Sequence, residues 1–258
     1  MSKDADIKRR LARRSGGSPE PRSIRCVSSY EREAREQGFS RIAGVDEVGR
    51  GCLFGPVFAA AVILDPERPI RGLRDSKIID AKEREKLAAQ IKTRAVSWGL
   101  GGADVFEIDQ INIYQASRLA MRRAIEALTV SPDYLLLDAI KVDLPIEQLP
   151  LIDGDARCRA IAAASIIAKV HRDSVLARWH EIFPQYNLAS NKGYSTSDHR
   201  RALRKHGPTL MHRFSFWPVR VNSRDVHWTG YLCGPSPQGE LFGESTEVLE
   251  IVASGATA

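Results

Sequence analysis

Apolar positions are dense between Ile42 and Val219, and they follow two alternating patterns. Short apolar runs predict buried strands, whereas longer stretches with apolar residues three or four positions apart predict helices. The apolar runs lie at residues 42–47, 57–64, 95–101, 134–138 and 149–153. The helical stretches lie at residues 29–37, 81–93, 111–128, 160–182 and 195–206. This alternation predicts an α/β fold, with a mixed sheet because a short glycine-rich turn joins the first two runs.

The same pattern predicts one folded domain with a tail on each side. Residues 26–220 form the predicted domain, and its core covers residues 41–220. Residues 1–25 hold eight basic and three acidic side chains and few apolar ones, so we expect a basic, disordered extension. Residues 221–258 hold one basic and five acidic side chains among many Gly, Ser and Pro residues, so we expect an acidic, poorly ordered tail.

Composition narrows the function classes. The net charge of +6 and the pI of about 9.2 are compatible with a polyanionic partner, although the N-terminal extension holds much of the excess. The longest apolar run is far too short to cross a bilayer, so we expect no membrane span. The cysteines, at positions 26, 52, 158 and 233, form no close pair, and no apolar secretory signal begins the chain. We therefore expect a cytoplasmic protein without disulfides or structural zinc.

Four carboxylates stand out because each lies at or beside the end of an apolar run. Asp46 and Glu47 end the first run, Asp138 ends the fourth, and Asp155 follows the fifth. A buried carboxylate needs a cation, a proton or hydrogen bonds, and any one of these acids could cap a helix or pair with a basic neighbour. Such neighbours are Arg50, Arg157 and Lys169. Four acids that converge from separate segments instead indicate a divalent cation, and all-oxygen ligands favour Mg²⁺ or Mn²⁺.

A turn of Gly49, Arg50 and Gly51 follows the first two acids directly. Glycines let the backbone bend sharply and expose N–H groups that can bind phosphate or hydroxyl oxygens. A plain hairpin turn explains the same residues, so the position of this turn is more informative than its composition. Because neighbouring residues of a regular strand point to opposite faces, Asp46 and Glu47 could share a site only where the strand ends or is distorted.

Together these residues resemble the opening signature of bacterial ribonuclease HII. The string IAGVDEVGRG at residues 42–51 carries the resemblance, followed by GPV at residues 55–57. Further matches follow in the same order, namely DSK at 75–77, INIYQA at 111–116, MRRA at 121–124, GD at 154–155, IAAASIIAKV at 161–170, KGY at 192–194, HGP at 206–208 and Arg213. The ordered series covers about residues 41–220.

The resemblance implies a ribonuclease H-like catalytic domain, with a five-stranded mixed sheet flanked by helices and a helical C-terminal part. It implies an endonuclease that hydrolyses the RNA strand of RNA–DNA hybrids and nicks duplex DNA on the 5′ side of embedded ribonucleotides. The implied cofactors are two divalent ions, Mg²⁺ or Mn²⁺, and the implied products carry 5′-phosphate and 3′-hydroxyl ends. We expect a monomer that acts on RNA–DNA hybrids and on duplex DNA containing ribonucleotides.

The resemblance also assigns residue roles. The catalytic, metal-binding acids of the family match Asp46, Glu47, Asp138 and Asp155. The turn that senses the ribose 2′-hydroxyl matches Gly49, Arg50 and Gly51, the tyrosine that stacks on the next sugar matches Tyr194, and a phosphate-contacting lysine matches Lys77. The chain departs from the family pattern at Cys52, Asn191 and Arg157-Cys158-Arg159. These departures leave the rate and the metal preference open.

Several alternatives remain open at the level of the residues. Tyr194 could be a half-buried core aromatic. Five basic side chains could contact phosphates or form a solvated helix face, namely Arg200, Arg201, Arg204, Lys205 and Arg213. A silent hybrid-binding module would have no reason to keep four acids. Ribonuclease HIII usually carries an extra N-terminal domain, for which residues 1–40 are too short and polar, and the glycine turn and Tyr194 fit ribose sensing better than they fit a Holliday-junction resolvase.

Overall fold

The computed structural model describes residue 26 and residues 28–222, which build a five-stranded sheet with the order β3-β2-β1-β4-β5. Its strands are β1 (Ile42–Val48), β2 (Val57–Ile63), β3 (Ser97–Ala103), β4 (Tyr134–Asp138) and β5 (Glu147–Leu151). β2 pairs antiparallel with both β1 and β3, whereas β1, β4 and β5 are parallel neighbours. The predicted five-stranded mixed sheet is therefore confirmed. The predicted tails, over residues 1–25 and from residue 223 onward, lie outside the described residues.

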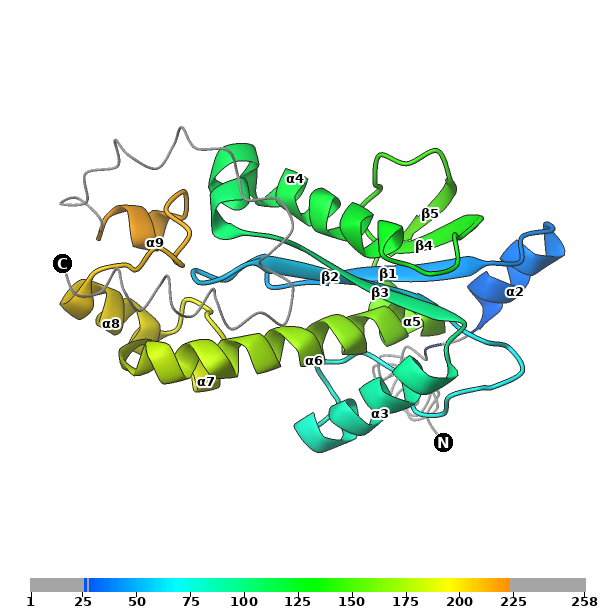
Figure 1. The fold of residues 1–258 in the computed structure, drawn as a ribbon, viewed down its shortest axis with the longest axis horizontal. Helices are drawn as coiled ribbons and strands as arrows, with labels where there is room; N and C mark the ends of the chain where they lie inside the picture. Colours follow the sequence, from blue (N-terminus) through cyan, green and yellow to red (C-terminus); the bar gives the residue numbers. More distant parts are fainter. Residues whose placement is uncertain (1–25, 27, 223–258) are drawn as a thin grey trace, which may run out of the picture.

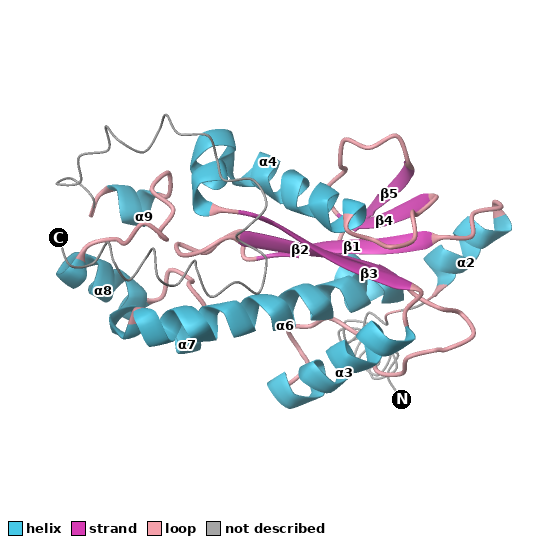
Figure 2. Cartoon of the chain, viewed as in Figure 1, coloured by secondary structure: helices cyan, strands magenta, loops and turns pink. Residues whose placement is uncertain are grey.

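Helices cover both faces of the sheet, as Figure 1 and Figure 2 show. One face packs against α4 (Val105–Glu126), and the other packs against α6 (Arg159–Ile182) and α3 (Ala81–Arg94). At one end of the molecule lies α2 (Ser29–Glu36), and the short α5 (Gly154–Arg157) precedes α6. The opposite end is the predicted helical C-terminal part, which consists of η1 (Pro184–Tyr186), α7 (Leu188–Asn191), α8 (Ser197–His206) and α9 (Trp217–Arg220). Among the described helices, none is both long and apolar enough to span a membrane.

The strands read as continuous apolar runs because helices bury both of their faces. In β1, Ala43 and Val45 belong to the core on the α4 side. In β2, Ala60 and Val62 belong to the core on the α6 side. Alternate residues of one strand therefore enter different cores, and the even positions of β1 and β2 face α6.

Glycines in the strands, among them Gly44 and Gly101, set how closely the helices approach the sheet. A side-chain carbon on Gly44 of β1 would overlap the backbone of Ala160 in α6, and one on Gly101 of β3 would overlap the backbone of Ala120 in α4. A larger residue at either position would force the helix and the strand apart. The contact at Gly44 bears on function because Asp46 lies two residues further along the same face of β1.

The helix predicted at residues 111–128 begins earlier, at Val105, because a capping box starts it. The Asp104 carboxylate accepts a hydrogen bond from the Glu107 N–H at 2.8 Å, and the Glu107 carboxylate accepts one from the Asp104 N–H at 2.9 Å. Asn112, with φ of 66° and ψ of 163°, then interrupts the helical backbone. The prediction was wrong at this boundary because the interruption at Asn112 shifts the apolar spacing between the two parts of the helix.

The segment after the glycine turn joins the sheet to the C-terminal part. The Leu53 N–H donates to the carbonyl of Gly193, and the Leu53 carbonyl accepts from the N–H of Arg213, both at 2.8 Å. Leu53 and Phe54 are buried in a core shared with Tyr186 of η1. The glycine turn is thus held between the end of β1 and the C-terminal helices.

Candidate active site

The four predicted acids come from three neighbouring parts of the fold. Asp46 and Glu47 lie near the end of β1, where they pair with Ala60 and Ala59 of β2, so the strand stays regular through both acids. The strand ends one residue later, at Val48. Asp138 is the last residue of β4, the parallel neighbour of β1.

Asp155 is the second residue of α5, which follows β5 directly, and this helix places it beside Asp138. The Asp138 carboxylate accepts a hydrogen bond from the N–H of Gly154, the first residue of α5, at 2.8 Å. The carboxyl ends of β1 and β4 and the start of α5 therefore meet at one edge of the sheet. This edge is where sheets with parallel strands commonly place their ligands.

Burial and mutual repulsion make Asp46, Glu47 and Asp138 hard to ionise. Asp46 is only 4% exposed, and its burial, followed by the charges of Glu47, Asp138 and Asp155, raises the pKa of its carboxyl well above the usual value. Burial also raises the pKa of Glu47, against the opposing charge of Arg50. Burial raises the pKa of Asp138 as well, although the hydrogen bond from Gly154 opposes the shift. A cation bound nearby would stabilise the ionised form of all three carboxylates and so lower their pKa values.

The donor set fits a hard divalent cation. One carboxylate oxygen of Glu47, Oε2, is buried and has no hydrogen-bond partner, so it is free to coordinate. The surrounding donors are carboxylate oxygens, which Mg²⁺ and Mn²⁺ accept. In the described part of the chain, no three His, Cys, Asp or Glu side chains are arranged so as to hold a metal ion as they stand. The assignment of all four acids as ligands stays a prediction.

Lys77 lies at the same edge of the sheet. Its Nζ is 3.0 Å from Oδ2 of Asp155 and 4.0 Å from Oδ1 of Asp75, although its side chain is 75% exposed. Burial opposes the charge of Lys77, but the hydrogen bond and the charge of Asp155 outweigh it and raise the pKa of the ammonium group. Lys77 therefore presents an exposed cation beside the acids.

The glycine turn lies directly beside the acids. Gly49 has φ of +93°, a backbone conformation that favours glycine, and a side-chain carbon there would overlap the guanidinium of Arg172. The side chain of Arg50 reaches back to Glu47, with its Nη1 3.3 Å from Oε1. The turn is thus linked to the acidic edge by an ion pair and by close packing.

Tyr194 lies beside this turn and is not a core residue. Its side chain is 41% exposed, and its backbone forms an isolated antiparallel bridge with Cys52. Its ring carbon Cε1 lies 4.0 Å from the position that a side-chain carbon on Gly51 would take. The guanidinium of Arg172 lies 5.8 Å from the centre of the ring. The ring and the exposed part of the turn therefore lie side by side next to the acids.

Comparisons with known proteins show the family to which the chain belongs. The family model for ribonuclease HII matches residues 43–219. Ribonuclease HII of Solibacter usitatus is 57% identical over 201 residues, which cover 78% of this chain and 88% of the relative. The chain belongs to the ribonuclease HII family. Ribonuclease HII of Moorella thermoacetica is 51% identical over 194 residues, which cover 75% of this chain and 94% of the relative.

A solved structure supports the fold independently. The ribonuclease H2 of Pyrococcus horikoshii superposes with a TM-score of 0.62 at 22% identity, over 71% of this chain and 97% of that one. The family match decides one alternative that the sequence left open: the chain is a nuclease rather than a silent binding module. As a member of the ribonuclease HII family it is a hydrolase of the ribonuclease H type that acts on RNA–DNA hybrids.

Arg213 corrects one sequence interpretation in this ribonuclease HII. The sequence grouped it with exposed basic residues, but it is fully buried. Its Nη1 donates to the carbonyl of Arg50 at 2.8 Å and its Nε donates to the carbonyl of Gly55 at 2.9 Å. Because it reaches the turn from behind, it holds the backbone of the turn and does not contact phosphate.

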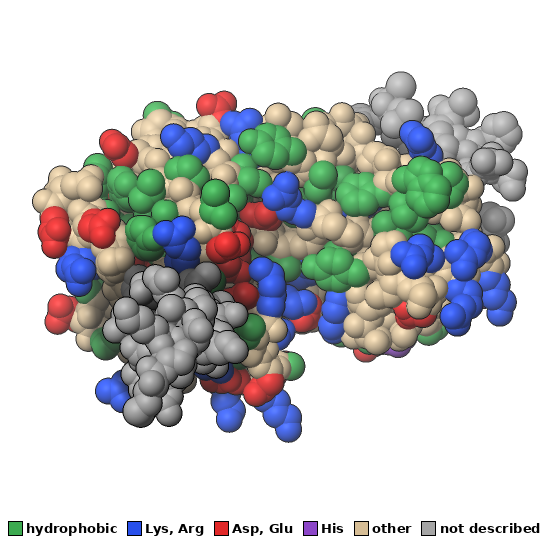
Figure 3. All heavy atoms as spheres, turned by 180° about the vertical axis from the view of Figure 1, so that it is seen from behind, with side chains coloured by type: hydrophobic (Ala, Val, Ile, Leu, Met, Phe, Trp, Pro, Cys, Tyr) green, Lys and Arg blue, Asp and Glu red, His purple; other side chains and the backbone are tan. Residues whose placement is uncertain are grey.

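The other basic side chains of that group are exposed on α8, namely Arg200, Arg201, Arg204 and Lys205. Figure 3 shows Lys and Arg side chains gathered at the end of the molecule that carries the C-terminal helices. Both interpretations of this helix face, phosphate contact or plain solvation, remain compatible with its exposure.

Arg172 is a site residue that the sequence analysis missed. It is 1% exposed, packs against Gly49, and its Nη1 donates to the carbonyl of Lys192 at 2.8 Å. It therefore connects the glycine turn to the segment that carries Tyr194. A guanidinium at this point of α6 resembles any helix-surface charge in sequence, and only the mostly apolar run at residues 160–168, earlier in the same helix, hints at burial.

The departures from the family pattern have structural partners. Asn191 is buried, donates to the carbonyl of Tyr186 at 2.6 Å and accepts from the N–H of Gly193 at 2.8 Å. The Cys52 thiol is buried and lies 3.6 Å from the carbonyl of Lys192. Both residues therefore support the loop before Tyr194.

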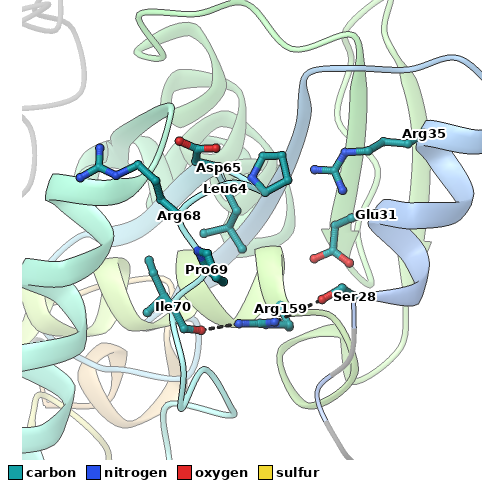
Figure 4. A pocket seen from close by; sticks show the side chains of 10 residues that line it. Ser28, Glu31, Arg35, Leu64, Asp65, Arg68, Pro69, Ile70 and Arg159 are labelled. Carbon is teal, nitrogen blue, oxygen red and sulfur yellow. Dashed lines mark hydrogen bonds between the residues drawn. The ribbon is translucent and has the colours of Figure 1, made fainter.

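Residues 157–159 connect the start of α6 to α2. Arg157 donates to the Tyr30 hydroxyl at 2.5 Å, and the Cys158 thiol is buried against Glu31. Arg159 donates to the Ile70 carbonyl and to the Ser28 hydroxyl across a pocket of about 220 Å³, which Figure 4 shows. This pocket lies between α2 and the segment before α3 and includes none of the predicted site residues.

Proposed function

We propose that this ribonuclease HII hydrolyses the RNA strand of RNA–DNA hybrids and nicks duplex DNA on the 5′ side of an embedded ribonucleotide by two-metal-ion phosphodiester hydrolysis. The products carry 5′-phosphate and 3′-hydroxyl ends. The observation that carries this proposal is the juxtaposition at one edge of the sheet: buried acids that resist ionisation lie beside a glycine turn and an exposed tyrosine ring. The acids suit metal-assisted hydrolysis of a phosphodiester, and the turn and the tyrosine ring suit recognition of the sugar.

Asp46, Glu47, Asp138 and Asp155 are the residues that would hold the ions, Mg²⁺ or Mn²⁺. When bound, such ions lower the pKa of a water and stabilise the charge that develops on the phosphoryl and leaving oxygens. The acids themselves act as ligands rather than as proton donors. Lys77, which pairs with Asp155 from an exposed position, is free to turn toward a backbone phosphate of the substrate.

The backbone of Gly49, Arg50 and Gly51 would read the ribose 2′-hydroxyl. This hydroxyl is the group that separates RNA from DNA at a single nucleotide, and a peptide backbone can bind it whatever the base. Cleavage should therefore depend on the sugar and not on the sequence. Tyr194 would stack on the sugar of the next deoxynucleotide, so that a ribose followed by DNA binds better than one followed by RNA.

The proposal includes a cytoplasmic monomer. The described cysteines, Cys26, Cys52 and Cys158, are free thiols, which suits a reducing compartment. The acids, the turn and Tyr194 all come from one chain, so a single copy would carry the complete set of predicted site residues.

The decisive experiment uses a labelled DNA duplex that contains one ribonucleotide, incubated with Mg²⁺ or Mn²⁺. We expect one nick on the 5′ side of the ribose, and we expect Asp138→Asn to reduce its rate by more than ~100-fold, beyond the usual effect of losing an outer-shell partner of a metal site. Glu85→Gln, at an exposed carboxylate of α3, is the matched control and should keep full activity. An intact duplex with the unchanged enzyme, or a nick retained by Asp138→Asn, would contradict the proposal.

A further inference from the structure

Two histidines are fully buried directly behind Tyr194, and the proposed chemistry uses neither of them. His199 lies on α8, and His212 lies in the loop between α8 and α9. Both side chains are 0% exposed, and their Nε2 atoms are 3.1 Å apart. The second nitrogen of each ring also has a partner, so the pair forms part of a longer hydrogen-bonded chain.

The partners determine where each proton lies. The N–H of Thr209 can only donate, and it is 2.9 Å from Nδ1 of His212, so this nitrogen accepts and the proton of His212 is on Nε2. That proton points at Nε2 of His199, which therefore accepts. The proton of His199 is then on Nδ1, from which it is donated to the carbonyl of Tyr194 at 2.9 Å. Both rings are neutral, and each has one tautomer.

This chain fixes the peptide group of Tyr194. The Tyr194 carbonyl accepts from His199 and also from the N–H of Thr196 at 2.8 Å. The N–H of Tyr194 donates to the carbonyl of Asn191 at 3.0 Å. Since the ring itself is exposed, its direction is set mainly by the backbone that carries it, and His199 supplies one of the hydrogen bonds that hold this backbone.

The same loop also holds the glycine turn. His212 is followed directly by Arg213, which donates to the carbonyls of Arg50 and Gly55 from the buried side. The backbone of Phe54 forms an isolated bridge with His212, and the two rings meet edge to face at 4.9 Å. The turn and Tyr194 are therefore positioned from one short segment, residues 209–213.

We propose that His199 and His212 are positioning residues that set Tyr194 against the Gly49–Gly51 turn, and that they determine the preference of the enzyme for a lone ribonucleotide in DNA over continuous RNA. The inference rests on the proposed function, because Tyr194 reads the sugar that follows the ribose. A lone ribonucleotide offers the enzyme one ribose and one neighbouring deoxyribose, so its cleavage depends on both contacts at their correct spacing. A continuous RNA strand offers a ribose at every position.

Two substitutions of His199 separate positioning from general support. In His199→Asn, the amide nitrogen takes the place of Nδ1 and can still donate to Tyr194, but the acceptor for His212 is lost. In His199→Gln, the amide oxygen takes the place of Nε2 and can still accept from His212, but the donor to Tyr194 is lost. Each variant loses one hydrogen bond of the buried chain, so both should lose similar stability.

The readout is the ratio of cleavage rates on a duplex with one ribonucleotide and on an RNA–DNA hybrid of the same length. We expect Tyr194→Ala to lower this ratio. We expect His199→Gln to lower it about tenfold, less than the ~100-fold effect of a 1 Å misplacement, and His199→Asn to keep it within about twofold. In the Tyr194→Ala background, His199→Gln should lower the ratio no further, because the two changes act on one contact.

Equal ratios in the two His199 variants, or additive losses in the double variant, would overturn the inference. If His199→Gln does not fold, His199→Leu takes its place: its side chain also lacks a donor to the Tyr194 carbonyl, so it should lower the ratio, whereas His199→Asn should not. If the unchanged enzyme makes no nick at a lone ribonucleotide, the proposed function fails separately. The inference is then decided by the NMR resonances of the Tyr194 ring, which must shift in His199→Gln but not in His199→Asn.

Discussion

Asp46 is a residue at which function and stability conflict. Its folded-state pKa is raised by burial and by three neighbouring carboxylates, so the folded protein keeps the proton that the unfolded chain loses. Stability is therefore lost as the pH rises from the ordinary aspartate pKa toward the raised one. Bound divalent ions would offset this loss of stability. Without ions, the same carboxylates that are proposed to support the reaction destabilise the fold.

We therefore predict that Asp46→Asn stabilises the ion-free protein by about 0.5–2 kcal/mol at neutral pH while it abolishes cleavage. The advantage over the unchanged protein should shrink as the pH falls toward 4, where the unfolded chain also keeps its proton. Urea unfolding of both proteins at several pH values, with a chelator present, measures this difference in the free energy of unfolding. Asp133→Asn is the opposite control: its carboxylate accepts from the N–H groups of Ser40 and Arg41, and its loss should destabilise the fold.

At the residue scale, the sequence predicted the acids but not the buried arginines that hold the neighbouring glycine turn in place. Acids at the ends of apolar runs are visible because burying a charge there is unfavourable, and the residues predicted for ribose recognition do lie beside them. Arg172 and Arg213 were missed or misassigned because a buried guanidinium looks like a solvated one until its partners are known. The partners of Arg213 are carbonyls 158 and 163 residues away in the chain.

At the element scale, the contact between β1 and α6 decides the geometry of the acidic edge. Gly44 lies against Ala160, and α5, which carries Asp155, directly precedes α6. A shift of α6 away from the sheet would therefore change the separation of Asp46 and Asp155. Sequence periodicity predicted both elements, but it could not predict this close approach, because a glycine in a strand has several structural explanations.

We predict that Gly44→Ala destabilises the fold by about 1–3 kcal/mol and lowers the activity of the molecules that remain folded. Gly101→Ala is the matched control, because the same added carbon meets the backbone of Ala120 in α4, on the opposite face of the sheet. It should cost similar stability and leave the activity per folded molecule unchanged. Thermal unfolding gives the folded fraction of each variant, and initial cleavage rates divided by that fraction give the activity per folded molecule of Gly44→Ala and Gly101→Ala. Equal specific activities would show that the spacing of β1 and α6 does not matter to the site.

At the scale of the whole molecule, the sheet provides the acids, and the C-terminal part holds the groups proposed to read the sugar. The segment of residues 49–55 belongs to both, since it leaves β1 and its Leu53 and Phe54 are buried against the C-terminal helices. The two halves respond oppositely to pH. Asp46, Glu47 and Asp138 have raised pKa values, whereas burial lowers the pKa of His199 and lowers that of His212 to about 3.

The buried histidines predict an acid-sensitive C-terminal part. Below the ordinary histidine pKa the unfolded chain binds protons that the folded protein refuses, so stability falls with pH until the folded pKa is reached. His212 faces His199 and the rings of Tyr186 and Phe54. Among the described residues, the negative charge that favours a proton on this pair is Asp198, which acts on His199.

We predict that His212→Gln is less stable than the unchanged protein at pH 7, because the packed ring is lost, and that this deficit shrinks as the pH falls to 4.5, by up to about 1.4 kcal/mol per pH unit. Urea unfolding followed by the fluorescence of the tryptophans at each pH measures the difference. His206→Gln, at an exposed histidine at the end of α8, is the control and should leave the pH dependence unchanged. A deficit that stays constant from pH 7 to pH 4.5 would mean that the folded protein accepts the proton, and that the chain from Thr209 to Tyr194 is not held in one tautomeric state.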